Sequence, residues 1–563
     1  MPPVNFAGPM RSPLFLLAVI VAPLVLEAQR LSDADAVDQM KYDVQYLASD
    51  RLEGREAGTA GERLAAEYIA QKFGNIGLMP YGDSATYRQA FPFAGVPKLG
   101  EANALQLGRK KLKLDNDWSP LPFSASGEVR GTVLKCGYGI HAPDLGYDDY
   151  ADLDLTGKVA ALSISSPDGI HPHSKYLAYH DLRTRADQAT ERGAVAVLFY
   201  NDDPTAEDPS LRFSDAINAG SVPAIFLKGD RYEKLVMDGN PCALAVEVER
   251  PQLTGYNLVG MLDNGREHVV VIGAHYDHLG YGSDGSLHRG EKAIHNGADD
   301  NASGVAVMLQ LARDLADMDE ARANDYLFIA FSGEEKGLYG SNYWTKHPTV
   351  PIAQLNYMIN LDMVGRLDSA HTLAVNGVGT SPAWKELEHV TLGGMDLRTT
   401  ESGIGPSDHS AFYMVDVPAI HFFTGTHEDY HKPGDDAEKL NYEGMLEVAR
   451  FIESLVTDLS DNGKLAFTKT KEDTAATPRF TVTLGVVPDY MYDGKGMRID
   501  GITEGKPASQ AGLKPGDVVV RMGQVEVNDM MGYMKALSLF QKGQTTTVVV
   551  LRGGEEVESE VTF

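Results

Sequence analysis

An alternation of apolar runs and helical patterns between residues 256 and 458 is the strongest constraint on the fold of this chain. Four runs of five or six residues are mostly apolar, and polar residues follow each of them (269–274, 326–331, 357–361 and 419–423). Apolar residues at helical spacing predict a helix from Gly304 to Met318, with Ser303 as its N-cap. Strands that are apolar on both faces need helices on both faces, so the sequence predicts an α/β fold around a mixed, mostly parallel sheet.

The rest of the chain divides into segments of different character. Residues 37–47 show helical periodicity, and Thr59 with Glu62 forms a capping box that predicts a second helix. Short β-like runs dominate residues 129–250, with one helical stretch at 183–192, which predicts a small mixed insert. The expected divisions are a signal peptide (1–28), a main domain in two pieces (31–125 and 252–460), an insert (126–251), a polar linker (461–477) and a small β-rich C-terminal domain (478–563).

Composition excludes several classes of function. The formal charge of −29 argues against nucleic acid or an anionic membrane as the main partner. The two cysteines, Cys136 and Cys242, cannot build a disulfide scaffold or a thiolate metal cluster. Arg11 and the apolar run 14–26 predict a secretory signal peptide cleaved near Ala28, and an uncleaved membrane anchor is the alternative. After removal of the signal we expect no membrane span.

Histidine and acidic residues collect where the apolar runs end. They are His275, Asp277, Asp299, Asp300, Glu334, Glu335, Asp362 and His431. The carboxyl ends of the strands form the binding crevice of an open α/β sheet, so residues distant in sequence can converge there. Clustered carboxylates repel one another, and divalent cations relieve that repulsion. Two histidines with three carboxylates suit zinc first, and one carboxylate can bridge two ions in a two-metal hydrolase.

Five motifs resemble, in order and spacing, those of the M28 family of co-catalytic zinc aminopeptidases. They span 275–277, 297–304, 332–335, 360–365 and 430–435, and the turn at 54–59 resembles the family's N-terminal stretch. The insert resembles a protease-associated (PA) domain. The C-terminal segment resembles a PDZ domain through residues 483–486 and 508–518. The resemblance implies a zinc exopeptidase-like sheet that carries a β-rich PA-like insert and a small PDZ-like β domain.

The resemblance also implies a role for each site residue. The implied roles are His275 and Asp362 as ligands of one zinc ion, Glu335 and His431 as ligands of a second, Asp299 as the bridge, Glu334 as general acid and base, Asp277 as the partner that orients His275, and Tyr430 as a contact of the oxyanion. The peptide bond between Asp299 and Asp300 is often cis in such proteins. Two Zn²⁺ ions per chain are the expected cofactors.

The function expected from this resemblance is hydrolysis of the N-terminal peptide bond of peptides with a free amine. One alternative is a glutamate carboxypeptidase, which needs a basic residue to clamp the substrate carboxylate, and Arg289, Arg366 and Arg398 are the candidates. A glutaminyl cyclase needs one zinc ion, which the complete two-metal set disfavours, and a non-catalytic binding scaffold is the alternative from another class. We expect a secreted or periplasmic enzyme whose PDZ-like domain takes a peptide or protein C-terminus.

Overall fold

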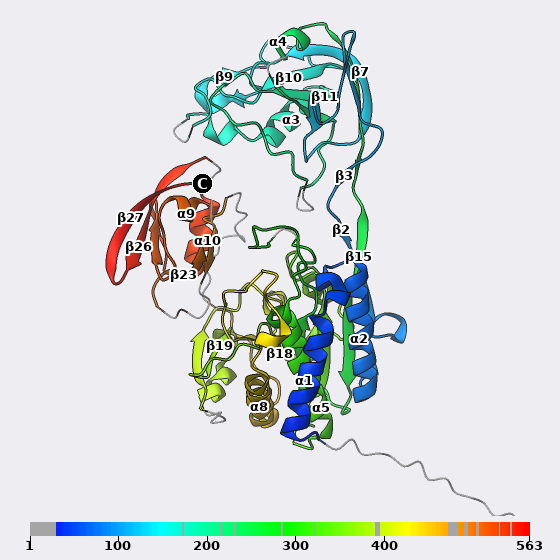
Figure 1. The fold of residues 1–563 in the computed structure, drawn as a ribbon, viewed down its shortest axis with the longest axis vertical. Helices are drawn as coiled ribbons and strands as arrows, with labels where there is room; N and C mark the ends of the chain where they lie inside the picture. Colours follow the sequence, from blue (N-terminus) through cyan, green and yellow to red (C-terminus); the bar gives the residue numbers. More distant parts are fainter. Residues whose placement is uncertain are drawn as a thin grey trace, which may run out of the picture.

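The computed structural model describes residues 30–563 apart from gaps at 172–173, 214–216, 230–231, 283–284, 321, 389–393, 471–481, 489–491, 493, 503–505, 529 and 541–542. The signal peptide predicted at 1–28 lies outside these residues. The three larger sheets occupy separate parts of the molecule (Figure 1). Within the described part of the chain, no helix is long and apolar enough to cross a membrane.

The largest sheet has nine strands in the order β1-β15-β17-β16-β18-β21-β19-β20, with β2 paired to β15. These strands are β1 (Met79–Pro80), β2 (Arg88–Ala94), β15 (Gln252–Leu262), β16 (Val269–His275), β17 (Asp325–Phe331), β18 (Leu355–Leu361), β19 (Thr372–Asn376), β20 (Asp396–Thr400) and β21 (Ala419–Phe423). The four predicted apolar runs become β16, β17, β18 and β21, which are adjacent and parallel. Strands β15 and β19 flank them in antiparallel pairing. The sheet is therefore mixed, as predicted, and parallel at its centre.

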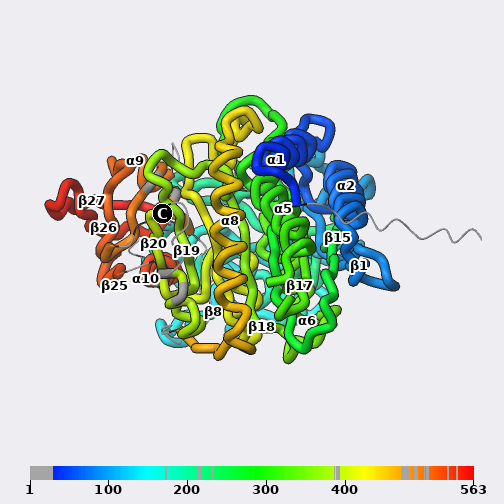
Figure 2. Tube along the Cα trace, turned by 90° about the horizontal axis from the view of Figure 1, so that it is seen from below, coloured from blue at the N-terminus to red at the C-terminus, as the bar shows by residue number. Residues whose placement is uncertain are grey.

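Helices cover both faces of this sheet, as the sequence predicts. One face carries α1 (Asp33–Leu47), α2 (Ala60–Ile76), α5 (Gly304–Asp317) and α8 (Tyr442–Asp458), and the other carries α6 (Tyr339–Lys346) and α7 (His409–Tyr413). Figure 2 shows α1, α5 and α8 side by side. The hydroxyl of Thr59 accepts from the backbone N–H of Glu62, so the predicted N-cap of α2 is confirmed.

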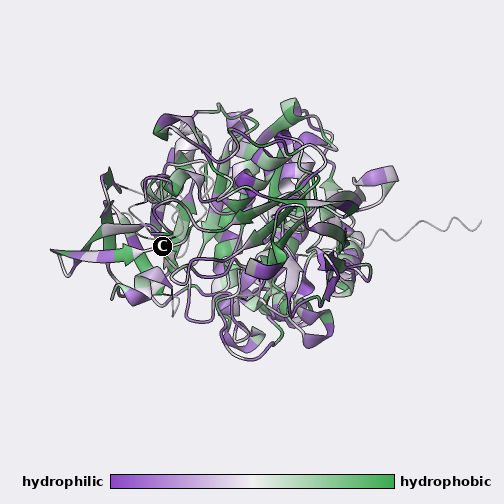
Figure 3. Ribbon diagram, turned by 90° about the horizontal axis from the view of Figure 1, so that it is seen from above, coloured by the Kyte–Doolittle hydropathy of each residue, from purple (hydrophilic) through white to green (hydrophobic). Residues whose placement is uncertain are grey.

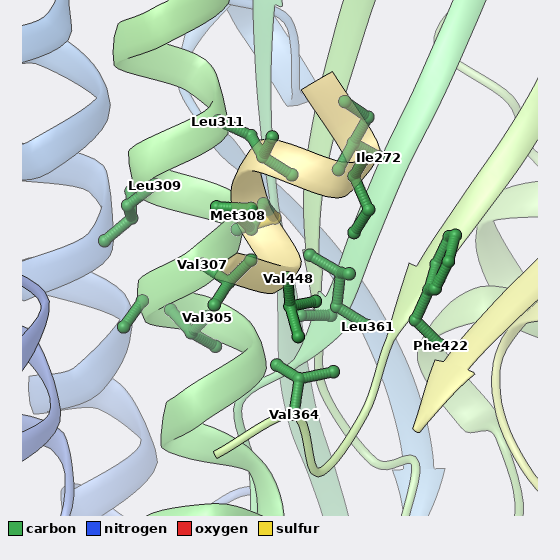
Figure 4. Close-up of a cluster of buried hydrophobic side chains, with 14 of the residues drawn as sticks. Ile272, Val305, Val307, Met308, Leu309, Leu311, Leu361, Val364, Phe422 and Val448 are labelled. Carbon is green, nitrogen blue, oxygen red and sulfur yellow. The ribbon is translucent and has the colours of Figure 1, made fainter. Parts of the chain in front are cut away.

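Strand β16 illustrates how the core forms. Val270 and Ile272 point into the cluster under α5 and α8, whereas Val271 points to the cluster under α6 and α7, because successive side chains of a strand face opposite sides. Figure 4 shows Val448 of α8 and Leu361 of β18 in the first of these clusters. Hydrophobic residues accordingly gather along the central elements of the molecule (Figure 3).

The start of α5 differs from the prediction. Residues Ala298–Ser303 form a π-helical segment, and Ser303 already has helical dihedral angles. Its hydroxyl donates to the carbonyl of Asp299 and accepts from the backbone N–H of Val364. Ser303 is therefore the residue before α5, as predicted, but its hydroxyl makes no capping hydrogen bond and instead ties the loop before α5 to the loop after β18.

The predicted insert supplies most of a second sheet. This sheet has eight strands in the order β5-β4-β13-β7-β10-β11-β12-β6. Its strands are β4 (Ala104–Leu107), β5 (Lys110–Leu112), β6 (Trp118–Pro120), β7 (Gly127–Lys135), β10 (Val159–Ser163), β11 (Ala196–Tyr200), β12 (Ala224–Leu227) and β13 (Pro241–Val246), accompanied by α3 (Leu182–Glu191) and α4 (Tyr232–Leu235). Two strand pairs lie beside it, β3 (Lys98–Leu99) with β14 (Val248–Glu249) and β8 (His141–Ala142) with β9 (Tyr147–Asp148). Strands β4, β5 and β6 precede residue 126, so the sheet begins earlier than the expected boundary. Strands of three or four residues are too short to show a clear hydrophobic period.

The third sheet forms a small C-terminal domain with its own core. Its strands are β22 (Val486–Pro488), β23 (Met497–Ile502), β24 (Val518–Met522), β25 (Val525–Glu526), β26 (Thr545–Arg552) and β27 (Glu555–Thr562), with helices α9 (Pro507–Gln510) and α10 (Met530–Ser538). All strand pairs in this sheet are antiparallel. Its described residues begin at 482, close to the expected start of the domain.

The first part of the predicted linker packs on the main domain. The side chain of Asn356 donates to the carbonyl of Gly463 and accepts from the backbone N–H of Leu465. Leu465 is 5% exposed and belongs to the main core. The backbone N–H of Thr468 donates to the carbonyl of Thr380 at 2.7 Å. Residues 463–470 are thus an edge of the main domain, and their polar composition conceals the one buried leucine.

Candidate metal centre

The predicted ligands meet at the carboxyl edge of the parallel strands. His275 ends β16, Glu334 and Glu335 follow β17, and Asp362 follows β18. The π-helical segment between β16 and α5 brings Asp300 to the same edge, and His431 reaches it from the loop after β21. Together these residues line a cavity of about 400 Å³.

Asp300 lies between two groups of potential ligands. On one side, His275 Nε2 is 3.3 Å from Asp300 Oδ1 and 3.2 Å from Asp362 Oδ1. On the other side, His431 Nε2 is 3.2 Å from Asp300 Oδ2 and 3.4 Å from Glu335 Oε2. The two oxygens of one carboxylate thus face two separate groups, which is the arrangement that a bridge between two metal ions needs.

This geometry corrects the expectation that Asp299 is the bridge. The Asp299 carboxylate faces away from the ligands, since its Oδ1 accepts from the backbone N–H of Gly365 at 2.7 Å and its Oδ2 lies 3.3 Å from His427 Nε2. The cis peptide bond joins Asp300 to Asn301, one residue later than expected. Two adjacent residues in a tight loop point in different directions, and the sequence of two aspartates carries no sign of which one faces the site.

His278 is a potential ligand that the sequence analysis missed. Its side chain is fully buried, and its Nδ1 lies 2.6 Å from Glu335 Oε1 and 3.9 Å from Asp300 Oδ2. Potential ligand atoms of His278, Asp300 and Glu335 lie within 4.8 Å of one another, as do those of His275, Asp300 and Asp362. The available signal was its position three residues after His275, just beyond the strand.

Asp277 lies where the prediction puts it but contacts His275 differently. The Asp277 carboxylate is 3.8 Å from His275 Nδ1, beyond hydrogen-bond range, whereas the Asp277 carbonyl oxygen is 3.2 Å from the same nitrogen. The carboxylate accepts instead from the backbone N–H of Glu334 at 3.1 Å. Asp277 therefore ties the end of β16 to the loop that carries the two glutamates.

Tyr430 lies at the rim of the same cavity. Its ring stacks on that of His431, with centroids 3.9 Å apart and an interplanar angle of 25°. The stack sets the plane of the imidazole, while the carbonyl of Gly285 lies 3.0 Å from His431 Nδ1. The contact of Tyr430 with an oxyanion stays a prediction.

Charge is crowded in this centre. Burial raises the pKa of Asp277 to about 7. Burial also raises the pKa of Glu334 well above its ordinary value, an effect that Asp362 and Glu335 reinforce and His275 opposes. Burial alone would lower the pKa of His431, but Glu335 and Asp300 outweigh it and raise that pKa to about 9. A cluster of this kind, with carboxylates that repel one another and histidines beside them, fits divalent cations.

Arg55 adds a fixed positive charge behind the centre. Its guanidinium is fully buried and donates to the carbonyls of Tyr276, Leu47, Asn296 and Gly297. Burial lowers the pKa of Arg55 to about 10, against the opposing effect of nearby carboxylates. Arg55 thereby joins the turn after α1 to the loop that carries Asp300, which accounts for the glycine-arginine turn singled out in the sequence.

The three arginines considered as carboxylate clamps lie elsewhere. Arg366 Nη2 is 3.2 Å from Asp429 Oδ2 and 3.6 Å from Asp435 Oδ1. Arg398 pairs with Asp396 on β20, and Arg289 is exposed in a loop. Among the described residues that line the cavity there is no arginine or lysine.

Comparisons with known proteins place two domains in the chain. Residues 257–456 match the model of Peptidase family M28, and residues 469–563 match that of the PDZ domain. The chain is 26% identical over 432 residues to the aminopeptidase YwaD of Bacillus subtilis, a match that covers 74% of this chain and 83% of that protein.

Two solved structures of bacterial enzymes are similar to this chain. An aminopeptidase from Aneurinibacillus sp. strain AM-1 is 24% identical, with a TM-score of 0.43, and the match covers 79% of this chain and 99% of that one. The zinc aminopeptidase BSAP from Bacillus subtilis is 22% identical, with a TM-score of 0.42, and the match covers 78% of this chain and 96% of that one.

Proposed function

The chain carries a peptidase domain of family M28 and a C-terminal PDZ domain, and on this basis we propose that it is a two-zinc aminopeptidase that removes N-terminal residues from peptides. The observation that carries the proposal is the position of Asp300, whose two carboxylate oxygens face two separate groups of histidine and carboxylate ligands. The Bacillus relative is itself named an aminopeptidase.

The chemistry of the donors fits zinc. His275 and Asp362 would hold one ion, His431 and Glu335 the other, and Asp300 would bridge them. Imidazole nitrogen and carboxylate oxygen are ordinary zinc ligands. When bound, the two ions polarise the scissile carbonyl and lower the pKa of the attacking water.

Glu334 is the proposed general acid and base of this reaction. Its Oε2 lies 4.0 Å from His275 Nε2, so the carboxylate borders the ligands without belonging to either group of three. The backbone N–H of Glu334 is held by Asp277, which fixes the start of the side chain. Glu334 accepts a proton from the attacking water and returns it to the leaving amine.

The charge of the cavity favours a substrate amine over a substrate carboxylate. Three ligand carboxylates and Glu334 face the cavity, and the described lining residues contain no basic side chain apart from the two ligand histidines and His421. These four carboxylates balance the four positive charges of two zinc ions, so the site has no cation left over for a substrate carboxylate. A terminal carboxylate needs a cation aimed at it, whereas a substrate amine does not. The ion pairs that hold Arg366 and Arg398 elsewhere weigh against the carboxypeptidase alternative.

The C-terminal PDZ domain supports a second proposal, that it takes the C-terminus of a peptide or protein and so brings longer substrates or a partner to the enzyme. We also keep secretion or a periplasmic location as a proposal, because it rests on the N-terminal sequence alone.

The decisive experiment compares one peptide in free and N-acetylated form at equal concentration. Acetylation should remove nearly all cleavage, and the free peptide should lose residues one at a time from its N-terminus. Equal cleavage of both forms, or products released from the C-terminal end, would contradict the proposal. Metal analysis of the same preparation should find two zinc ions per chain, and a value of one at saturating zinc would contradict the bridged centre.

A further inference from the structure

One wall of the cavity at the candidate metal centre contains none of the proposed metal ligands. Asn360 of β18, His421 of β21 and Asn376 of β19 are register partners across three neighbouring strands. Val375 and Ile420, which directly precede Asn376 and His421 in their strands, belong to the core on the opposite face of the sheet. These three polar side chains therefore form one row on the cavity side.

The hydrogen bonds of this row leave His421 with a donor. The side-chain amide Nδ2 of Asn360 donates to Ser407 Oγ at 2.8 Å and to His421 Nδ1 at 3.1 Å. Because Nδ1 accepts, the ring hydrogen of neutral His421 lies on Nε2. No described residue accepts from Nε2 within hydrogen-bond distance. The ring is held in place by a parallel stack on His409, with centroids 4.8 Å apart and an interplanar angle of 7°.

Asn376 provides a second donor beside it. Its Oδ1 accepts from Thr400 Oγ1 at 2.8 Å, which leaves both hydrogens of Nδ2 without an acceptor in the described part of the chain. Asn376 is 8% exposed and His421 is 3% exposed, and both line the cavity. Both donors face the cavity, so a ligand group that accepts hydrogen bonds can pair with them there.

Part of the lining of the same cavity is apolar. Met363 and Phe423 cluster there with Ala374, and Tyr430 packs against them. Phe423 follows His421 on the same face of β21, with ring centroids 6.0 Å apart. The cavity therefore offers a substrate side chain both apolar contacts, from Met363 and Phe423, and the donors of His421 and Asn376.

We propose that this wall selects the N-terminal residue of the substrate, and that the preferred side chain has an aliphatic stem ending in an uncharged hydrogen-bond acceptor, as in glutamine. The inference rests on the proposed aminopeptidase function and adds the substrate class. A lysine would bring a cation against two N–H donors. A glutamate would bring a third carboxylate beside Glu334 and Asp362, with no basic side chain other than histidine to receive it.

The test is a series of amino-acid p-nitroanilides that differ in the end of the side chain: glutamine, norleucine, glutamate and lysine. For the wild-type chain, kcat/KM for glutamine should exceed that for norleucine by about tenfold, which corresponds to about 1.4 kcal/mol for the added hydrogen bonds. Asn376→Asp keeps the shape but turns the donor into an anionic acceptor, so it should move the preference from glutamine to lysine. His421→Phe keeps the ring and removes the Nε2 donor, so it should lower the rate for glutamine and spare norleucine.

His409→Phe is the matched control, because His409 stacks behind the wall and does not line the cavity. It should leave the ratio of glutamine to norleucine unchanged. Cleavage of norleucine at a rate equal to or above that of glutamine would overturn this inference and leave the aminopeptidase proposal standing. An unchanged ratio in Asn376→Asp, with normal cleavage of norleucine, would overturn it as well. If no compound with a free amine is cleaved, the proposed function fails, and the inference fails with it.

Discussion

Two adjacent aspartates in the loop before α5 have different surroundings. Asp300 lies near three histidines of the candidate metal centre. Its pKa is held well below the ordinary value because His278, His275 and His431 outweigh the opposing effect of burial. Asp299 accepts from a backbone N–H and lies beside His427. The two Cα–Cβ bonds point in different directions in this turn, and that difference decides which carboxylate can bind a metal ion.

Replacement of these two residues should give different results. Asp300→Asn removes the charge of the proposed bridge, so at least one zinc ion per chain should be lost on dialysis and kcat should fall more than a hundredfold. Asp299→Asn keeps the shape and the acceptor for Gly365, so it should retain both ions. Metal analysis with kinetics on one short peptide checks both, and loss of zinc in Asp299→Asn alone would restore the original assignment.

Glu334 should matter for turnover and not for metal. Glu334→Gln keeps the size of the side chain and removes the base, and general-base catalysis typically contributes about 10²–10⁴-fold. We expect a fall in kcat of that order with two zinc ions retained. Loss of zinc in this variant, with zinc retained in Glu335→Gln, would show that the two neighbours have exchanged roles.

His278 should set the affinity of the second zinc site. Its Nδ1 lies 2.6 Å from Glu335 Oε1, and partners of metal-binding carboxylates typically contribute 10–100-fold in affinity. His278→Ala should therefore weaken zinc binding by about that factor in a chelator competition. His278→Asn places an amide N–H near the position of Nδ1 and should recover most of the loss. Equal affinity in wild type and His278→Ala would exclude this role.

At the scale of single elements, an ion pair links two strands of the C-terminal domain. Asp517, in the turn before β24, accepts from Arg552 Nε at 2.7 Å, from Arg552 Nη2 at 2.6 Å and from the backbone N–H of Lys514 at 2.8 Å. Burial alone would raise the pKa of Asp517, but these donors outweigh it and lower the pKa. The charged carboxylate thus ties the end of β26 to the start of β24.

A lowered pKa in the folded state means that the stabilisation is present above the unfolded pKa and is lost as pH falls through the folded value. Asp517→Asn should destabilise the C-terminal domain at pH 7, but only modestly, because Arg552 is exposed to water that screens the pair. The difference between wild type and variant should shrink below about pH 4. Calorimetry of the full chain at several pH values checks this, and a difference that grows on acidification would contradict it.

At the scale of the whole molecule, the peptidase domain extends beyond the end of its last α-helix, α8, to Thr470. Leu465 is buried in the main core, and Thr470 contacts Tyr413 through its backbone N–H and its hydroxyl. The segment from 463 to 470 closes one edge of the domain before the chain continues to the PDZ domain.

A chain ending at Thr470 and one ending at Ser460 should therefore behave differently. Both keep every proposed zinc ligand, but the shorter chain exposes the site of Leu465, whose burial contributes about 1.5–3 kcal/mol. We expect the longer chain to keep the thermal stability of the peptidase domain and its kcat/KM on short peptides, and the shorter one to melt several degrees lower. A collapse of short-peptide activity in the longer chain would show that the PDZ domain completes the active site.

The amino-acid sequence by itself determined the central strands, the need for helices on both faces of the sheet, and the residue types of the candidate metal centre. These are local properties: a strand buried on both faces is apolar throughout, and the binding crevice of an open α/β sheet lies where its parallel strands end. The tertiary structure decided what depends on direction and on distant partners. It turns Asp300, and not Asp299, toward the other candidate ligands, and it places His278 beside Glu335. It also pairs Asn376 with His421, which lie 45 residues apart in the chain, on neighbouring strands. It also buried Leu465 within a polar segment. The hydrophobic periodicity of a sequence shows which face of a helix or strand is apolar. The direction of a single side chain in a loop depends on the backbone turn that carries it and on the neighbours that the fold brings to it.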